Sequence, residues 1–144
     1  TFCDIVIATE NARFVQPEIK LGVFPPMGAV VYPRVIGPKR AMELLLTGEP
    51  INAQQALTMG LVSRVVPKAA LQESVDALVK RISDQSAPVL QLMKRVIFEG
   101  TWRPFDEALR LSQNIYLNQL FELEDSQEGL RALIEKRKPV WKNR

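Results

Sequence analysis

The chain has 144 residues, of which 47% are hydrophobic and 24% are charged, and its formal net charge is +3. These values are typical of an ordinary globular protein, and no apolar run approaches the ~20 residues that a membrane span needs. The absence of histidine excludes histidine-based triads and most zinc sites within the chain. We therefore expect no metal, and any acid/base chemistry must use carboxylates, lysine, tyrosine or water.

The first predicted element is a strand over residues 1–9, TFCDIVIAT, in which FCDIVIA has the nearly continuous apolar character that is typical of parallel strands. Further short strands are expected over residues 12–15 and 63–66. Because these are few partners for a parallel strand, we expect that sheet-forming sequence precedes Thr1. The single cysteine, Cys3, is expected to be a buried thiol in a reducing, cytoplasmic compartment.

The next segment is rich in proline. Pro17 and the pair Pro25–Pro26 exclude a regular helix between them. Beyond them, a short apolar helix is predicted over residues 27–35. The run from Gly22 to Ala29 is expected to be a turn that leads into this helix, either as a simple connection or as a helix N-terminus whose N–H groups face an anion or a polarised carbonyl.

Two helices with clear end signals follow. The first has Pro38 in its first turn and Gly48 just past its end. The second is predicted to begin with a capping box formed by Asn52 and Gln55 and to stop at Gly60.

The rest of the chain is predicted to be helical. Apolar stripes at helical spacing run through residues 71–82, 89–97 and 105–120. A last helix is expected to start with a capping box of Asp125 and Glu128. Because these stripes hold more apolar positions than a small bundle covers, we expect part of this surface to be an oligomer interface.

Glu18 is the first candidate for acid/base chemistry. It follows Pro17 and is flanked by the apolar side chains of Ile19 and Leu21. A carboxylate held against apolar surface has its charged form disfavoured, a condition that suits a general acid or base near neutral pH. From the residues alone, a surface or ion-paired glutamate is the alternative.

Five stretches of the chain carry a specific pattern: CDIVIA, FVQPEIKLG, RVIGPKRAMELLLTG, AQQALTMGLVSRVVP and DSQEGLRALIEKRKPVWKNR. In their order and spacing they resemble the crotonase superfamily, the enoyl-CoA hydratases and isomerases. The resemblance covers essentially the whole chain but only the latter half of a family member.

The resemblance implies an α/β fold of the ClpP/crotonase type, here as a C-terminal fragment in which short strands precede a mainly α-helical oligomerisation region. Residues 1–66 would form the end of the crotonase core, and residues 67–144 the helical oligomerisation region. A homotrimer, or a hexamer made of two trimers, is the implied assembly of the full-length protein.

The resemblance also implies a substrate and a site. The family binds acyl-CoA thioesters, so coenzyme A enters as part of the substrate and no separate cofactor is expected. Two backbone N–H groups stabilise the enolate-like anion of the thioester, and two glutamates handle water and the proton. Glu18 matches the second glutamate. The first glutamate and the N–H donors would precede Thr1, so the chain would hold half of a site.

Four further residues are candidates for substrate binding. Phe24 and Met27 would add bulk near the acyl pocket. Pro26 replaces a family glycine whose N–H helps to hold the catalytic water, and proline has no N–H to offer. Lys136 aligns with a family lysine that reaches the coenzyme A of a neighbouring subunit, although a solvated lysine at a helix end is the alternative.

The expected function is hydration or isomerisation of unsaturated acyl-CoA, and Glu18 is expected to act as general acid/base. The full-length protein would be a lyase of fatty acid metabolism. Because FPP versions resemble relatives that act on cyclic dienoyl-CoA, such a hydratase, or a hydrolase or decarboxylase of the same superfamily, is the alternative. A non-catalytic assembly or binding module is a third reading. We expect no nucleic acid partner, since aromatic and basic residues are not interleaved, and no membrane partner.

Overall fold

The computed structural model describes residues 3–144, and its backbone divides into two compact units with the boundary between Ala77 and Leu78. The first unit contains all the strands of the described residues and the second is helical. The division predicted after Val66, between the end of the crotonase core and the oligomerisation region, is a functional division and stays a prediction.

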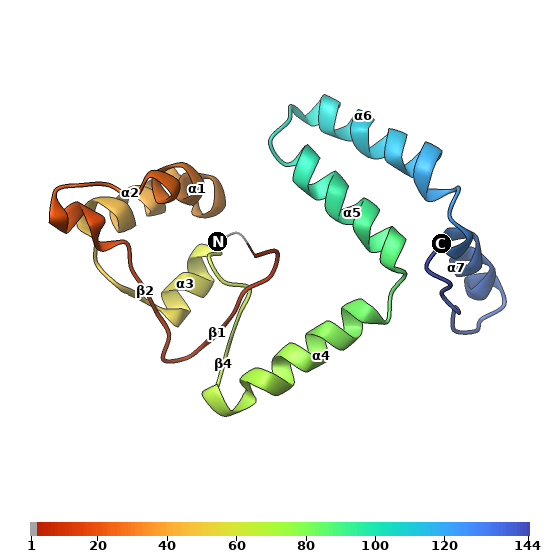
Figure 1. Ribbon diagram of the computed structural model, residues 1–144, viewed down its shortest axis with the longest axis horizontal. Coiled ribbons are helices and arrows are strands. Elements are labelled where there is room, and N and C mark those ends of the chain that lie inside the picture. The colour runs from red at the N-terminus through yellow and green to blue at the C-terminus, as the bar shows by residue number, and fades with distance from the viewer. Residues whose placement is uncertain (1–2) are drawn as a thin grey trace. The chain divides into compact units, whose positions relative to one another are not determined.

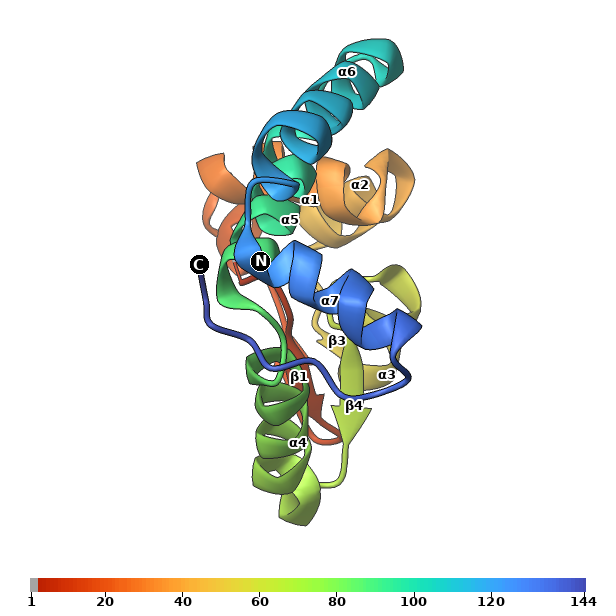
Figure 2. The ribbon, with the colours of Figure 1, turned by 90° about the vertical axis from the view of Figure 1, so that its right-hand side faces the viewer.

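The first unit contains two short sheets (Figure 1). Strand β1 (Ile7–Thr9) pairs in parallel with β4 (Arg64–Val66), and Figure 2 shows these two strands side by side. Strand β2 (Arg13–Phe14) pairs antiparallel with β3 (Ile51–Asn52). The short strands predicted near residues 12–15 and 63–66 are confirmed, whereas β3 had no strand signal of its own.

Two predictions about the beginning of the chain are wrong. The strand expected over residues 1–9 ends at Thr9 but starts only at Ile7, because its described partner β4 offers a register of three residues; residues 1–2 lie outside the described residues. Cys3, expected to be buried, is exposed. The reason is the same, since the residues just after Cys3 precede the paired segment and are also exposed.

The proline-rich segment forms one turn and one helix. A 3₁₀ helix, η1 (Pro17–Leu21), ends at Gly22, whose φ of 76° is the left-handed conformation that glycine adopts without strain. Helix α1 (Pro26–Ile36) follows with Pro25 at its N-cap. The predicted helix is confirmed and extends one residue further at each end.

The predicted end signals of the next helices are confirmed. Helix α2 (Pro38–Thr47) is closed by Gly48 at a φ of 59°. Helix α3 (Ala53–Met59) starts at a capping box in which the Asn52 side chain accepts from Gln55 N and the Gln55 side chain accepts from Asn52 N, each at 2.8 Å.

The core of the first unit joins the strands to α1, α2 and α3, and α1 packs along α2 (Figure 1). Its buried residues are mostly small or branched apolar side chains, together with one tyrosine: Ala8, Tyr32, Ile36, Ala41, Leu44, Ile51, Ala56, Leu61 and Val62. Packing in the core therefore fixes the ring of Tyr32, and its hydroxyl group can reach the start of the η1 segment.

Helix α4 (Leu71–Ser83), preceded by the 3₁₀ turn η2 (Lys68–Ala70), runs across the boundary between the units. In the second unit, α5 (Ala87–Gly100) and α6 (Phe105–Ile115) pack as a helical hairpin (Figure 1). A π-helical turn, η3 (Tyr116–Leu120), and α7 (Glu124–Ile134) complete it. The predicted helices are confirmed, except that the stripe over residues 105–120 divides into α6 and the π-helical turn η3.

The capping box predicted for the last helix is wrong. The N-cap of α7 is Leu123, and Asp125 is the second residue inside the helix. Its carboxylate accepts from the backbone N–H groups of Lys142 at 2.7 Å and Asn143 at 3.0 Å. The spacing of the two acids resembled a capping box, but the returning C-terminal tail competes for the carboxylate of Asp125.

Candidate active site

The backbone around Glu18 is held by local hydrogen bonds. Glu18 is the second residue of η1, and its carbonyl oxygen accepts from Val23 N at 3.3 Å. Gly22 N donates to Ile19 O at 3.2 Å. Because Pro17 fixes φ at the first position of η1 and Gly22 ends the turn, the sequence itself defines a short, tight platform for Glu18.

The end of α2 packs directly against this turn. A Cβ atom on Gly48 would lie 3.0 Å from Ile19 Cγ2 and 3.3 Å from the carbonyl oxygen of Gln16. An ion pair joins the same two segments, since Lys20 Nζ lies 2.6 Å from Glu49 Oε1. The position of the Glu18 turn in the first unit therefore depends on the absence of a side chain at Gly48.

The carboxylate of Glu18 faces the side-chain amide of Gln16. With the amide oriented so that both its groups find partners, Gln16 Nε2 donates to the two Glu18 oxygens at 3.1 and 3.2 Å, and Gln16 Oε1 accepts from the Tyr32 hydroxyl at 3.1 Å. A chain of hydrogen bonds thus runs from the buried Tyr32 through Gln16 to Glu18, which is itself half-buried.

The three other candidates of the first unit lie at or just before the N-terminus of α1. Phe24 is 66% exposed, and Met27 is 61% exposed. Pro26 is the first residue of α1, where a missing N–H costs the helix nothing but leaves the helix N-terminus one donor short. Glu18, Phe24, Pro26 and Met27 therefore belong to one short stretch of the first unit, with exposed apolar side chains around it.

Lys136 belongs to the second unit, in the turn after α7. It adopts a φ of 54°, a left-handed conformation that is uncommon for a residue with a side chain. The turn is closed by Lys136 N, which donates to Leu133 O at 3.2 Å, and by Arg137 N, which donates to Ala132 O at 3.0 Å.

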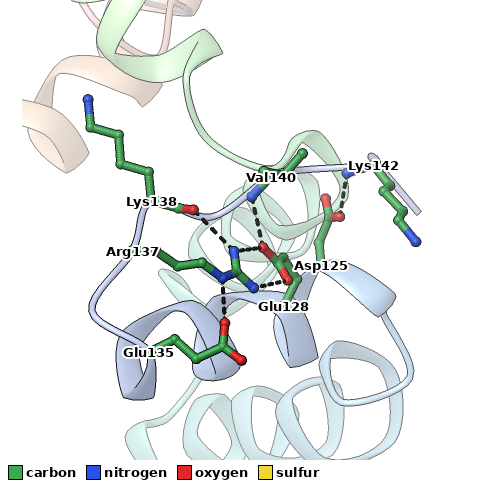
Figure 3. A network of polar contacts seen from close by, with 7 residues as sticks. All are labelled: Asp125, Glu128, Glu135, Arg137, Lys138, Val140 and Lys142. Atoms are coloured by element: carbon green, nitrogen blue, oxygen red, sulfur yellow. Dashed lines mark hydrogen bonds and ion pairs between the residues drawn. The ribbon is translucent and has the colours of Figure 1, made fainter.

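Arg137, the residue after Lys136, anchors this turn (Figure 3). The Arg137 guanidinium donates to both carboxylate oxygens of Glu128 and to Glu135, and Val140 N donates to Glu128 Oε1 at 2.9 Å. The Arg137 side chain and the N–H of Val140 lower the pKa of Glu128 to about 2, and Glu128 raises the pKa of Arg137. This network was not predicted from the sequence, although the acid Glu128 on α7 and Arg137 just after this helix could have indicated it.

The C-terminal tail is fastened to the helices at further points. Asp125, which is 1% exposed, holds the N–H groups of Lys142 and Asn143, and Asn143 Oδ1 accepts from Ala87 N at 3.0 Å. Burial opposes ionisation of Asp125, whereas the backbone N–H groups of Lys142 and Asn143 favour it, so that its pKa lies below the ordinary value. The tail that follows Lys136 is thus an ordered part of the second unit.

Two classes of site find no support in the described residues. Within residues 3–144, no cluster of three or more His, Cys, Asp or Glu side chains is arranged to hold a metal ion. None of the helices in this range is both long and apolar enough to cross a bilayer.

Comparison with known proteins identifies the class. A profile of the enoyl-CoA hydratase/isomerase family matches residues 1–144. The chain therefore belongs to this family, as its sequence resemblance had indicated.

Curated relatives and solved structures support the same family assignment. The human enoyl-CoA hydratase domain-containing protein 3, mitochondrial, is 39% identical over 139 residues, which cover 96% of this chain and 46% of the relative. A probable enoyl-CoA hydratase of Mycobacterium tuberculosis is 40% identical over 143 residues, covering 99% and 55% respectively.

A crystal structure of an enoyl-CoA hydratase from Bacillus anthracis superposes with a TM-score of 0.92 at 34% identity, covering 99% of this chain and 55% of that one. The structure of the human domain-containing protein 3 gives a TM-score of 0.91 at 38% identity, with coverages of 96% and 55%. The predicted crotonase-like fold, mainly helical with short strands, is therefore confirmed. The chain spans about half the length of the curated relatives it matches.

Proposed function

We propose that this chain is the C-terminal half of an enoyl-CoA hydratase/isomerase-type enzyme that acts on unsaturated acyl-CoA thioesters, with Glu18 as general acid/base. The observation that carries the proposal is a half-buried carboxylate on a hydrogen-bonded turn, beside an exposed apolar stretch, in a chain that matches this family along its whole length. The remaining part of the site, an oxyanion hole and a second glutamate, would come from sequence before Thr1.

In this proposal Glu18 takes a proton from water as the water oxygen bonds to Cβ of the enoyl group. The electrons of the double bond move toward the thioester, and the second glutamate supplies the proton at Cα. In an isomerase, Glu18 would carry a proton between carbon atoms instead. Phe24 and Met27 would line the acyl chain with apolar surface, and coenzyme A would enter only as part of the substrate.

Lys136 would meet a phosphate of coenzyme A, and its exposed position on an anchored turn supports that role. The exposed apolar side chains of the second unit support a homotrimer or a hexamer of the full-length protein. A cytoplasmic location, based on the single cysteine, stays a prediction.

The first test is Glu18→Gln in the full-length enzyme. Because the amide cannot accept the proton, we expect kcat to fall by about 100-fold or more while the affinity for acyl-CoA changes little. Steady-state hydration and isomerisation assays measure kcat, and calorimetric titration with the product acyl-CoA measures binding. A variant with wild-type kcat would rule out Glu18 as the acid/base group.

A cyclic dienoyl-CoA hydratase is the second candidate, because Pro26 removes an N–H at the N-terminus of α1 that would otherwise hold water. A panel of linear and cyclic unsaturated acyl-CoA substrates separates the two. A kcat/KM at least 10-fold higher for a cyclic dienoyl-CoA would favour the second candidate, and the opposite order the first.

A further inference from the structure

We propose that Arg137 is a positioning residue for substrate binding, which holds the turn after α7 in the conformation that presents Lys136 to a phosphate of coenzyme A. This inference rests on the proposed function, since it requires Lys136 to meet that phosphate. It adds a second residue to that proposal, one that acts through the backbone of the turn and does not itself contact the substrate.

The observation that carries the inference is the backbone conformation of Lys136. Among residues 3–144, only two residues other than glycine have a positive φ, Lys136 at 54° and Asn143 at 58°. Asparagine tolerates the left-handed conformation, whereas a lysine keeps it only where the surrounding contacts impose it. The turn therefore holds Lys136 in a strained conformation, and the contacts that impose this strain fix the direction of its side chain.

Arg137 supplies most of these contacts (Figure 3). Its backbone N–H donates to Ala132 O at 3.0 Å, and Ala132 is 1% exposed, so this bond ties the turn to the buried side of α7. Its guanidinium donates to Glu128 Oε1 and Oε2 at 2.5 and 2.9 Å, to Glu135 and to the carbonyl oxygen of Lys138. The planar guanidinium thus fixes α7, the turn and the tail relative to one another.

The two neighbouring basic side chains differ in what they can offer to a ligand. The guanidinium of Arg137 is engaged by two carboxylates, and its side chain is 37% exposed. The Lys136 side chain is exposed, and no carboxylate of residues 3–144 pairs with its ammonium group. Because the pKa of Glu128 is lowered to about 2, its pair with Arg137 stays ionised at neutral pH. Arg137 is therefore suited to anchor the turn, and Lys136 to contact a phosphate.

The C-terminal tail is also held independently of Arg137. Lys142 N and Asn143 N donate to the buried carboxylate of Asp125 at 2.7 and 3.0 Å. Removal of the Arg137 side chain therefore leaves the tail attached to α7 and frees mainly the turn that carries Lys136. We expect such a variant to fold and to lose the fixed direction of the Lys136 side chain, which raises the entropy cost of binding.

The test uses the full-length enzyme with substitutions Lys136→Met and Arg137→Met. The substrates are the acyl-CoA with the highest kcat/KM in the panel above and the pantetheine thioester of the same acyl group, which carries no phosphate. For acyl-CoA, we expect KM to rise about 10-fold in Lys136→Met and about 3- to 10-fold in Arg137→Met, the scale of a lost charge-assisted hydrogen bond, with kcat changed less than about 2-fold. For the pantetheine thioester, neither substitution should change KM.

Three further variants separate action through Lys136 from other roles. Because Arg137 acts through Lys136, the double variant Lys136→Met/Arg137→Met should have the same KM for acyl-CoA as Lys136→Met alone. Arg137→Lys keeps the positive charge but loses the planar fork, so it should also raise this KM. Arg110→Met, which removes an ion pair with Asp106 between two exposed side chains of the same unit, is the control and should keep wild-type KM.

The outcomes distinguish this inference from the proposed function. A raised KM for acyl-CoA in Lys136→Met together with wild-type KM in Arg137→Met would overturn the inference and leave the proposed role of Lys136 standing. Wild-type KM in Lys136→Met would overturn both.

Three other results would also refute the positioning role. They are equal rises in KM for the acyl-CoA and the pantetheine thioester, effects that multiply in the double variant, and wild-type KM in Arg137→Lys, which would show that charge alone is sufficient. Thermal unfolding checks that each variant is folded. If Arg137→Met is not folded at the assay temperature, Arg137→Lys decides in its place.

Discussion

At the scale of single residues, the carboxylates of Glu18 and Glu128 have different partners. Glu18 faces the neutral side-chain amide of Gln16, which donates to both of its oxygens. Glu128 faces a guanidinium, which holds it ionised and fixes the turn that carries Lys136. Glu128 therefore has a structural role, and proton transfer is the role that we propose for Glu18.

The Glu128–Arg137 pair predicts a pH dependence of stability. The pKa of Glu128 is lowered from 4.5 to about 2 by the side chain of Arg137 and the N–H of Val140, so the unfolded chain binds its proton first as pH falls. The stability that this carboxylate contributes is fully present above pH 4.5 and is lost progressively toward pH 2.

The measurement is the melting temperature of wild type and Glu128→Gln between pH 7 and pH 3. The wild type should melt higher at pH 7, and the difference should shrink below about pH 4.5. Glu122→Gln, an exposed acid of the same unit, serves as the control and should follow the wild type. A difference that stays constant with pH would contradict a role for the charge of Glu128.

At the scale of elements, the contact between the end of α2 and η1 places Glu18 within the first unit. Gly48 and Gly60 close two successive helices in the same left-handed conformation, with φ of 59° and 85°. They differ in their surroundings: a Cβ on Gly48 would press on Ile19 and Gln16, whereas a Cβ on Gly60 would meet nothing within 4 Å. Substitution of Gly60 therefore tests backbone strain alone, whereas substitution of Gly48 tests backbone strain together with a packing contact.

This difference predicts distinct effects of two alanine substitutions. Gly60→Ala should cost about 1–2 kcal/mol, the penalty of a left-handed conformation for a residue with a Cβ atom, and leave kcat unchanged. Gly48→Ala should cost more and also lower kcat, because η1 must move to admit the methyl group. Chemical denaturation and steady-state kinetics of the full-length enzyme measure both. Equal kcat in the two variants would show that Glu18 does not depend on this contact.

At the scale of the whole molecule, much apolar surface of the chain faces solvent. In the second unit, Met93, Ile97 and Phe98 on α5 are each more than half exposed. In the first unit, β1 and β4 form a parallel sheet of two strands, an arrangement that normally extends on both sides. From both features we expect these surfaces to pair with further polypeptide.

We therefore expect the purified 144-residue chain to show no hydratase turnover and to self-associate. The full-length enzyme should be active and should elute at the mass of a trimer or hexamer. Light scattering coupled to size-exclusion chromatography and a hydration assay on both proteins make the comparison. Turnover by the 144-residue chain, or a monomeric full-length enzyme, would contradict this expectation.

Local signals predicted most of the elements. The capping box of Asn52 and Gln55 and the terminating glycines depend on contacts within a few residues, so the sequence is sufficient to specify them. The prediction for Asp125 and Glu128 used the same local rule and was wrong, because the C-terminal tail and Arg137 occupy the two carboxylates.

By itself, the sequence determined the family, the order of the helices and Glu18 as the candidate acid/base residue, since motif spacing and helical periodicity are properties of the chain alone. The tertiary structure decided what surrounds that carboxylate. Gln16 and Tyr32 lie 16 positions apart, and their hydrogen bond exists only because α2 packs against both α1 and η1. Such partners depend on packing between elements, which periodicity does not specify.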